Sequence, residues 1–241
     1  MVEGHTDVSA RFGPFKMMIN DWTDLPEKPA IGTGEVQVWV ARVDEQAPEE
    51  FWRLLSDDEL ARADRLHSPQ VARRFGVGRG ILRVILGSYL GQEPGELVFS
   101  YGEQGKPFVK DCLRAGLSFN LAHSAGLVVA VVASGLEVGV DIEQVHPVSE
   151  LERAAGVFLS PQELERLSRL PPDEKLEAFF SWWTRKEAAL KAFGRGMMSD
   201  VILLQDEKTA VLPGAQDCQV ERFSPEPGYA GALATFAGSV F

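Results

Sequence analysis

The sequence predicts an α+β protein built from two similar lobes that follow one another along the chain. The prediction rests on two observations: each half contains stretches with helical periodicity, and in each half short apolar, mainly antiparallel strands follow them. With 241 residues, 45% of them hydrophobic, the chain can bury a sizeable core. We expect an irregular lead-in over residues 1–34, an N-terminal lobe over residues 35–135 and a C-terminal lobe over residues 136–241.

The first elements are a strand and a short helix. The lead-in contains several glycines and prolines and shows no sustained periodicity. Residues 35–43 alternate apolar and polar side chains, as a half-buried strand does, and place three valines on one face: Val36, Val38 and Val40. Ser56 and Glu59 have the spacing of a capping box, which predicts that a helix begins there and continues through Ala63.

A long helix and three strands complete the predicted N-terminal half, and a fourth strand follows them. The helix covers residues 69–90, with Arg74, Arg79 and Arg83 spread around it and six apolar residues turned inward: Val71, Phe75, Leu82, Ile85, Leu86 and Leu90. The apolar, β-rich runs that follow lie at residues 97–101, 117–121, 127–133 and 138–145. The last of these opens the C-terminal lobe.

The second half repeats the order of helices and then strands. A helical stretch lies near residues 150–157, and Ser160, Pro161 and Glu163 supply a cap, a first-turn proline and an acid for a second helix. A long helix follows over residues 173–193 and ends at Gly194 and Gly196. The last strands are expected near residues 201–205, 219–223 and 231–236.

Composition excludes several classes of function. The net charge of −11 argues against broad nucleic-acid binding, although the arginines between residues 53 and 83 favour a local anionic ligand. Two cysteines are too few for a disulfide framework and have no zinc-ligand spacing, so a cytoplasmic location is expected. The longest apolar stretch, residues 127–133, is too short to cross a bilayer, so no membrane association is expected.

The segment Gly139–Glu143 places two carboxylates on one side of a strand. Asp141 and Glu143 share one face, while Val140 and Ile142 share the other. Side chains two positions apart in a strand lie about 7 Å from one another, which allows both to reach one cation. A solvated strand face has the same pattern, so this triplet alone leaves both interpretations open.

An acid interrupts the apolar stripe of the helix at residues 173–193. Glu187 occupies a stripe position among five apolar residues: Leu176, Phe179, Phe180, Trp183 and Leu190. A buried carboxylate needs a partner, and Lys191, one turn onward, is one candidate through an ordinary ion pair. A metal shared with Asp141 and Glu143 is the other. Three oxygen donors without His or Cys suit Mg²⁺ rather than zinc.

Two further residues are candidates for phosphate contact. His123 ends one β run, where it could contact a phosphate or assist proton transfer, and a satisfied turn histidine is the alternative. Lys106 lies in a Gly-Lys-Pro turn before a strand, and because exposed turn lysines are common, this turn is uninformative by itself.

Taken together and in order, these motifs resemble the signature of the Sfp-type 4'-phosphopantetheinyl transferases. The resemblance covers residues 56–196. Four elements carry it: Gly105-Lys106-Pro107, Phe119-Asn120-x-x-His123-Ser124, Gly139-Val140-Asp141-Ile142-Glu143 and Trp183-Thr184-x-Lys186-Glu187-Ala188-x-x-Lys191-Ala192-x-Gly194.

The resemblance implies a pseudo-dimeric fold that binds coenzyme A in a cleft between two lobes. It implies that the Mg²⁺ ligands are Asp141, Glu143 and Glu187. Lys191 and His123 would contact the phosphates of coenzyme A. Further coenzyme A contacts are implied at Arg62, near the 3'-phosphate, at Lys106 and, as a weaker addition, at Arg79.

The implied activity is transfer of 4'-phosphopantetheine from coenzyme A to a serine of an apo acyl or peptidyl carrier protein, with release of 3',5'-ADP. The catalytic residues would be Glu187, Lys191 and His123, and Glu187 would accept the serine proton, directly or through a bound water. The chain departs from the family pattern at Ala122, commonly serine in relatives, and at Glu59, where some relatives have lysine.

The sequence also gives expectations for partners, oligomeric state and alternative functions. We expect carrier proteins to dock on residues 156–175, and because one chain contains both lobes, we expect a monomer. A catalytically silent relative that only binds coenzyme A or carrier protein is the alternative function. Other phosphoryl-transfer enzymes are disfavoured because the sequence has no Gly-rich P-loop.

Overall fold

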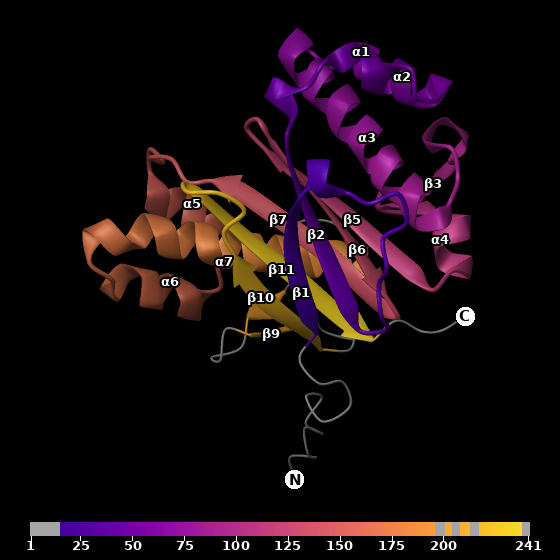
Figure 1. Cartoon of the computed structure of the whole chain (residues 1–241). Helices are drawn as coiled ribbons and strands as arrows, with labels where there is room; N and C mark the ends of the chain where they lie inside the picture. Colours follow the sequence, from indigo (N-terminus) through magenta and orange to yellow (C-terminus); the bar gives the residue numbers. More distant parts are fainter. Residues whose placement is uncertain (1–14, 196–200, 204–207, 213–216, 238–241) are drawn as a thin grey trace.

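Two β-sheets form the centre of the molecule, and helices cover their outer faces (Figure 1). The computed structural model describes residues 15–195, 201–203, 208–212 and 217–237. The first sheet has the strand order β1-β2-β6-β5, the second has the order β7-β11-β10-β9-β8, and β3 and β4 form a separate hairpin. The predicted α+β class is confirmed.

The elements have the following bounds. The strands are β1 Lys16–Asp21, β2 Glu35–Arg42, β3 Phe99–Tyr101, β4 Pro107–Val109, β5 Leu117–Ser124, β6 Leu127–Ser134, β7 Leu136–Gln144, β8 Ile202–Leu203, β9 Thr209–Val211, β10 Cys218–Phe223 and β11 Tyr229–Ala237. The α-helices are α1 Pro48–Trp52, α2 Asp57–Asp64, α3 Pro69–Leu90, α4 Lys110–Arg114, α5 Leu151–Phe158, α6 Pro161–Arg169 and α7 Pro172–Phe193. Single turns of 3₁₀-helix lie at Trp22–Asp24, Val43–Glu45 and Pro94–Glu96.

The first sheet contains a strand that the sequence did not predict. Residues 16–21, placed in the irregular lead-in, form β1, which pairs in parallel with β2 at the edge of the sheet. Three of its six residues, Lys16, Ile19 and Asp21, are exposed, and the exposed positions do not alternate strictly. An edge strand that uses its backbone for pairing leaves little periodic signal in its side chains.

Strand β2 is buried on both faces, whereas alternation predicted a half-buried strand. The valines Val36, Val38 and Val40 pack between the two sheets. On the other face Trp39 and Ala41 pack beneath α3. The central position of β2, between β1 and β6, accounts for the difference, because a helix layer covers one face and the second sheet covers the other.

Helix α3 has the predicted bounds, but its buried face differs from the prediction. Pro69 stands at its first position, and Gly91 ends it with φ +63°. Val71 is 38% exposed, so its predicted inward placement is wrong. Arg79 and Arg83, predicted only to be spread around the helix, are both buried, and both pair with Glu59 of α2.

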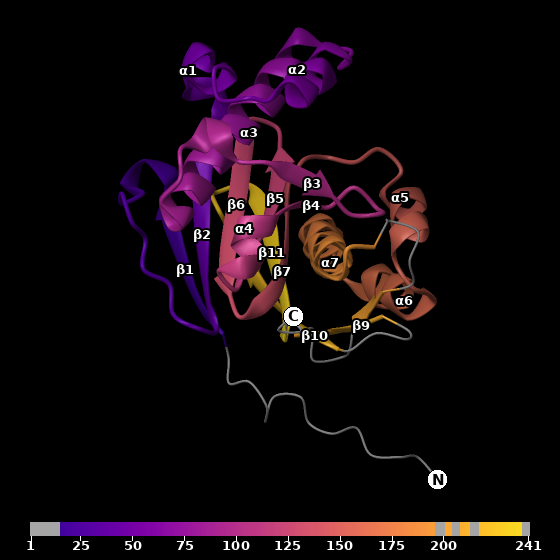
Figure 2. The same cartoon turned by 90° about the vertical axis from the view of Figure 1, so that its right-hand side faces the viewer.

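Helix α7 packs against the second sheet, with α5 and α6 beside it (Figure 2). One apolar cluster joins α7 to β10 and β11, while another joins β7 and β11 to the first sheet. The layers therefore run from α3 through the first sheet and the second sheet to α7. The sequence predicted α7 to begin at residue 173, one residue after its actual start, and to end at residue 193, where it does end.

The two sheets meet where β5 and β7 lie side by side. The Asn120 side-chain oxygen on β5 accepts a hydrogen bond of 3.0 Å from the Val140 backbone N–H on β7. Ser118 Oγ donates to the Leu136 carbonyl at 2.5 Å. The predicted division of the chain at residues 135 and 136, at the start of β7, stays a prediction. Within the described parts of the chain, no helix combines the length and the apolar character that crossing a bilayer requires.

Candidate active site

Strand β7 presents the two predicted carboxylates on one face. Its alternate residues Val138, Val140 and Ile142 are fully buried between the sheets. Asp141 and Glu143 therefore lie on the opposite face, as the alternation predicts. Asp141 is only 6% exposed, while Glu143 is half-buried. The structure thus excludes the alternative of a fully solvated strand face at Asp141.

A glycine lets α7 approach this strand closely. A Cβ at Gly139 would lie 2.1 Å from the Ala188 carbonyl oxygen and 2.2 Å from the Ala192 backbone nitrogen. Any larger residue would push the helix away from β7. The contact places the turn of α7 that carries Glu187 next to the strand segment that carries Asp141.

The three predicted metal ligands interact electrostatically. Burial raises the pKa of Glu187, and the negative charges of Asp141 and Glu143 raise it further. Burial is also the largest cause of the raised pKa of Asp141 and of Glu143. Each carboxylate is therefore harder to ionise than in water, which is the condition under which a bound cation is most favourable.

The positive group that contacts these acids in the structure is Lys191. Its Nζ lies 2.7 Å from Asp141 Oδ1, so the ion pair joins α7 to β7 rather than Lys191 to Glu187 within the helix. The second Asp141 oxygen, Oδ2, is buried without a hydrogen-bond partner. Ser124 Oγ donates to Glu143 Oε2 at 2.8 Å and so orients that carboxylate. The role of Ser124 was not predicted.

These residues fit a divalent cation. A buried carboxylate oxygen without a partner, next to two further carboxylates with raised pKa values, is the donor set that Mg²⁺ prefers. Among the described residues, no group of three or more His, Cys, Asp or Glu side chains already surrounds a common point at ligating distance. On binding of a metal, the carboxylate side chains would therefore have to rotate, and the contact between Lys191 and Asp141 would have to loosen.

His123 lies at the end of β5 among positive charges. Partial desolvation lowers the pKa of its ring, and the charges of Lys191, Arg62 and Arg74 lower it further. Three cationic side chains that act on one exposed histidine form a region of positive potential beside the carboxylates. Such a region suits a ligand with several negative charges.

Arg62 and Arg79, both predicted to contact coenzyme A, have different environments. Arg62 is exposed on α2 and lies over the Phe75 ring, 5.3 Å from its centre. Arg79 is buried, lies 4.7 Å from the centre of the Phe99 ring and pairs with Glu59 at 3.2 Å. Burial lowers the pKa of Arg79. Coenzyme A contacts at both residues stay predictions.

Glu59 connects three elements of the N-terminal half. One of its oxygens, Oε2, accepts hydrogen bonds from the Ser56 backbone N–H at 3.0 Å and from Arg83 Nε at 2.8 Å. Arg83 Nη1 also donates to the carbonyl oxygens of Pro94 and Leu97, at 2.9 Å each. Glu59, which stands where some relatives have lysine, is thus the centre of a buried network that joins α2, α3 and the segment leading to β3.

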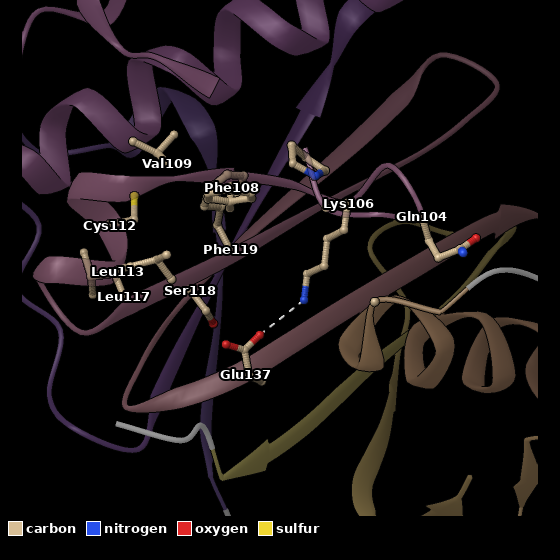
Figure 3. Close-up of a pocket in the computed structure, with 13 residues that line it drawn as sticks. Gln104, Lys106, Phe108, Val109, Cys112, Leu113, Leu117, Ser118, Phe119 and Glu137 are labelled. Carbon is tan, nitrogen blue, oxygen red and sulfur yellow. Dashed lines mark hydrogen bonds and ion pairs between the residues drawn. The ribbon is translucent and has the colours of Figure 1, made fainter. Parts of the chain in front are cut away.

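Lys106 is held by the protein rather than exposed in its turn. Its Nζ lies 3.3 Å from Glu137 Oε2 and donates to the carbonyl oxygens of Val138 at 3.1 Å and Ala192 at 3.2 Å. Burial lowers the pKa of Lys106. Figure 3 shows Lys106 and Glu137 at one side of a mainly apolar cavity of about 260 Å³ beneath the β3–β4 hairpin. Lys106 therefore ties this hairpin to β7 and to the end of α7.

Other predicted positions are structural or lie outside the described residues. Ala122 is buried between the two sheets, so its side chain packs in the core. Gly194 ends α7 with φ +64°, as predicted. Gly196, the second predicted stop signal, lies outside the described residues, as do residues 204–205 of the predicted strand that contains β8.

The comparisons with known proteins agree with these motifs. Residues 137–227, which include β7, α7 and most of the second sheet, match the model of the 4'-phosphopantetheinyl transferase superfamily. The chain is 43% identical over 184 residues to the 4'-phosphopantetheinyl transferase HetI of a Nostoc species, covering 75% of this chain and 78% of that protein.

Two further relatives cover similar shares. The 4'-phosphopantetheinyl transferase AcpT of Salmonella typhimurium is 34% identical over 170 residues, which are 70% of this chain and 84% of the relative. The 4'-phosphopantetheinyl transferase Sfp of Bacillus subtilis is 29% identical over 192 residues, which are 77% and 84% of the two chains. On this similarity and on the motifs placed above, the chain belongs to the 4'-phosphopantetheinyl transferase superfamily.

Proposed function

We propose that this chain transfers the 4'-phosphopantetheine group of coenzyme A to a serine of an apo acyl or peptidyl carrier protein, with release of 3',5'-ADP. The observation that carries the proposal is the group of Asp141, Glu143 and Glu187, mutually interacting carboxylates that lie beside Lys191 and the cations around His123. The names of the relatives, all 4'-phosphopantetheinyl transferases, support it.

Mg²⁺ is part of the proposal. Asp141, Glu143 and Glu187 would hold the ion, with the unpartnered Oδ2 of Asp141 as one donor. When bound, Mg²⁺ would neutralise negative charge on the pyrophosphate of coenzyme A, which is the charge that phosphoryl transfer increases.

The cations of the chain would bind the phosphates of the same substrate. Lys191 contacts Asp141, and its ammonium group would also bind the pyrophosphate. His123, with its pKa lowered by its surroundings, would donate a hydrogen bond as a neutral ring, and Arg62 would contact the 3'-phosphate. Lys106 and Arg79 would border the coenzyme A site from the β3–β4 turn and from α3, although the protein groups they already contact limit their freedom.

Glu187 is the proposed base. The serine hydroxyl oxygen forms a bond to the β-phosphorus of coenzyme A, the bond from that phosphorus to 3',5'-ADP breaks, and the serine proton passes to Glu187. In the metal-free chain, burial and the charges of Asp141 and Glu143 raise the pKa of Glu187, so its carboxylate accepts a proton more readily than one in water.

We place the carrier-protein surface at residues 156–175, which include the end of α5 and all of α6. Val157 in this segment is 73% exposed, an apolar side chain available to a partner. Because the proposed metal ligands and the proposed coenzyme A contacts all lie on one chain, we propose that the protein is a monomer. Because both cysteines are free and buried, we propose that it is a cytoplasmic enzyme.

The experiment that tests this function is incubation of a panel of apo-carrier proteins with coenzyme A, read by intact mass. We expect one carrier or more to gain the mass of phosphopantetheine with Mg²⁺ and none to gain it with EDTA. Carriers with the acceptor serine replaced by alanine are the control. Binding of carrier or coenzyme A without any gain in mass would favour the alternative, a catalytically silent relative.

A further inference from the structure

Lys186 is buried in α7, next to Glu187, and its ammonium group reaches a neighbouring pair of helices. The residue is 8% exposed. Its Nζ lies 2.6 Å from Glu163 Oε2 and donates to the Phe158 carbonyl oxygen at 2.9 Å. Phe158 is the last residue of α5, and Glu163 lies in the first turn of α6. One side chain of α7 therefore fixes the α5–α6 corner, which we define as residues 157–163.

Glu163 shares one oxygen between Lys186 and the start of α6. The same Oε2 accepts the Ser160 backbone N–H at 2.7 Å, and Ser160 Oγ accepts the Glu163 backbone N–H at 3.3 Å. This reciprocal arrangement is a capping box, which sets where α6 begins. Glu163 is 4% exposed, so its charge is compensated chiefly by Lys186. The position of the cap and the position of Lys186 are therefore coupled.

An aromatic contact holds the corner at a second point of α7. The rings of Phe158 and Trp183 are stacked with centres 4.1 Å apart and planes inclined by 24°. Trp183 lies three residues before Lys186, so both contacts come from adjacent turns on one side of α7. The corner is thus positioned by two different kinds of contact with the same helix.

The turn of α7 that fixes the corner also presents Glu187. Successive residues of an α-helix point about 100° apart, so Lys186 faces α5 and α6 while Glu187 faces the carboxylates of β7. The exposed Val157 lies at the corner, one residue before Phe158. A displacement of the corner relative to Lys186 would therefore change the distance from a docked protein to Glu187.

We propose that Lys186 is a positioning residue for the carrier-protein substrate: through Glu163 and the Phe158 carbonyl it holds the α5–α6 corner at a fixed place relative to Glu187. The inference rests on the proposed function. It differs from a purely structural role, because a pair that only stabilised the fold would affect both substrates alike. A positioning pair affects the carrier substrate and leaves coenzyme A unaffected, because Lys191, the proposed phosphate contact on α7, faces β7 and not the corner.

The test uses Glu163→Gln and Lys186→Met, alone and together, with Glu152→Gln as the matched control. In Glu163→Gln the amide oxygen can still accept the Ser160 N–H, so the cap is kept and only the charge is lost. Glu152 also joins α5 to α7, through a long pair with Lys175 at 3.9 Å, and the Glu152 side chain is 89% exposed. Steady-state constants for apo-carrier and for coenzyme A are measured with each variant, together with the melting temperature.

We expect Glu163→Gln to lower kcat/KM for the carrier about 10- to 100-fold, through KM, and to leave KM for coenzyme A within about twofold. Lys186→Met should act in the same direction, the double variant should lose less than the product of the two single losses, and Glu152→Gln should resemble wild type. A folded Glu163→Gln variant with an unchanged carrier KM, or with equal losses for both substrates, would overturn the inference alone. Failure of the wild-type chain to modify any carrier would overturn the proposed function and the inference with it.

Discussion

Lys191 Nζ lies 2.7 Å from Asp141 Oδ1, so a cation of the chain itself contacts a carboxylate that we assign to Mg²⁺. The contact joins the helix that carries Glu187 to the strand that carries Asp141. A bound Mg²⁺ would therefore share Asp141 with Lys191, and their charges would repel each other. Opposite effects of one substitution on metal affinity and on turnover follow from this arrangement.

Replacement of Lys191 by methionine should increase the affinity for Mg²⁺ in the absence of coenzyme A and decrease the rate of transfer. Removal of a nearby positive charge should strengthen Mg²⁺ binding about tenfold. Loss of a cation at the pyrophosphate should slow transfer about 100-fold. Titration calorimetry with Mg²⁺ and the carrier mass assay measure the two effects. Lys16→Met, on an exposed surface pair, is the control, and weaker Mg²⁺ binding by Lys191→Met would contradict the assignment.

Replacement of Glu187 by glutamine should abolish transfer without loss of stability. The variant loses the proposed base and a metal ligand, which we expect to lower kcat about 10²- to 10⁴-fold. In the absence of metal its melting temperature should not fall, because burial and the charges of Asp141 and Glu143 oppose ionisation of Glu187. Thermal unfolding and the mass assay test both statements. Transfer at the wild-type rate would remove Glu187 from the mechanism.

The stability of the metal-free protein should depend on pH through the three carboxylates. Since their folded pKa values are raised above the ordinary values of 3.8 for Asp and 4.5 for Glu, the folded chain binds more protons than the unfolded chain in this range. Their contribution is therefore fully present below the ordinary values and is lost as the pH rises through the raised ones. Saturating Mg²⁺ should remove this dependence.

The measurement is thermal unfolding in EDTA and in Mg²⁺ at a series of pH values upward from 4.5, the ordinary pKa of Glu, with Asp141→Asn compared at each pH. The difference in melting temperature between wild type and Asp141→Asn should shrink as the pH falls. For a chain of this size, 1 kcal/mol corresponds to about 2–4 °C. A constant difference across the whole range would show that Asp141 does not titrate as proposed.

The His123 ring should have a pKa below 6.5 in the free protein, because desolvation and then the charges of Lys191, Arg62 and Arg74 disfavour the protonated ring. Binding of coenzyme A should raise this pKa, since its phosphates oppose those charges. Proton NMR titration, with His123→Gln to identify the resonance, measures both values. Arg62→Ala should raise the pKa in the free protein, and an unaltered pKa in that variant would place Arg62 away from His123.

Two glycine substitutions should have opposite effects on stability. Gly139→Ala places a Cβ within 2.2 Å of two backbone atoms of α7, so we expect a loss of about 3 kcal/mol or more and weaker Mg²⁺ binding. Gly156→Ala in α5 meets no atom within 4 Å and should stabilise the protein by about 0.5–1 kcal/mol. Denaturant unfolding compares them. Equal tolerance at both positions would contradict the close approach of β7 and α7.

The sequence predicted those parts of the fold that depend on local signals. Proline at the first position and glycine just past the end set both bounds of α3, and the capping boxes at Ser56 and Ser160 set the starts of α2 and α6. β1 was missed, because a parallel edge strand is specified by its pairing with β2 and not by its own pattern. The burial of both faces of β2 was missed for a similar reason, because one face packs on the second sheet, whose strands lie much later in the sequence.

The candidate site could be predicted where a charged residue interrupts an apolar pattern, as Glu187 does in the apolar stripe of α7. It was not predictable where partners come from distant elements. Lys106 and Arg79 have the side chains expected for anion contacts, but the fold engages them with Glu137 and Glu59. Lys191 pairs with Asp141 rather than with Glu187 for the same reason. Its partner lies on β7, a strand distant in the sequence that packs closely against α7.

At Gly139 the backbone of β7 touches the backbone of α7, with no side chain between them. Main-chain atoms therefore set the distance between β7 and α7 at this point. Side-chain substitutions elsewhere in the core do not change the size of these atoms. We therefore expect the distance between the acids of β7 and Glu187 of α7 to survive exchange of the apolar residues around them.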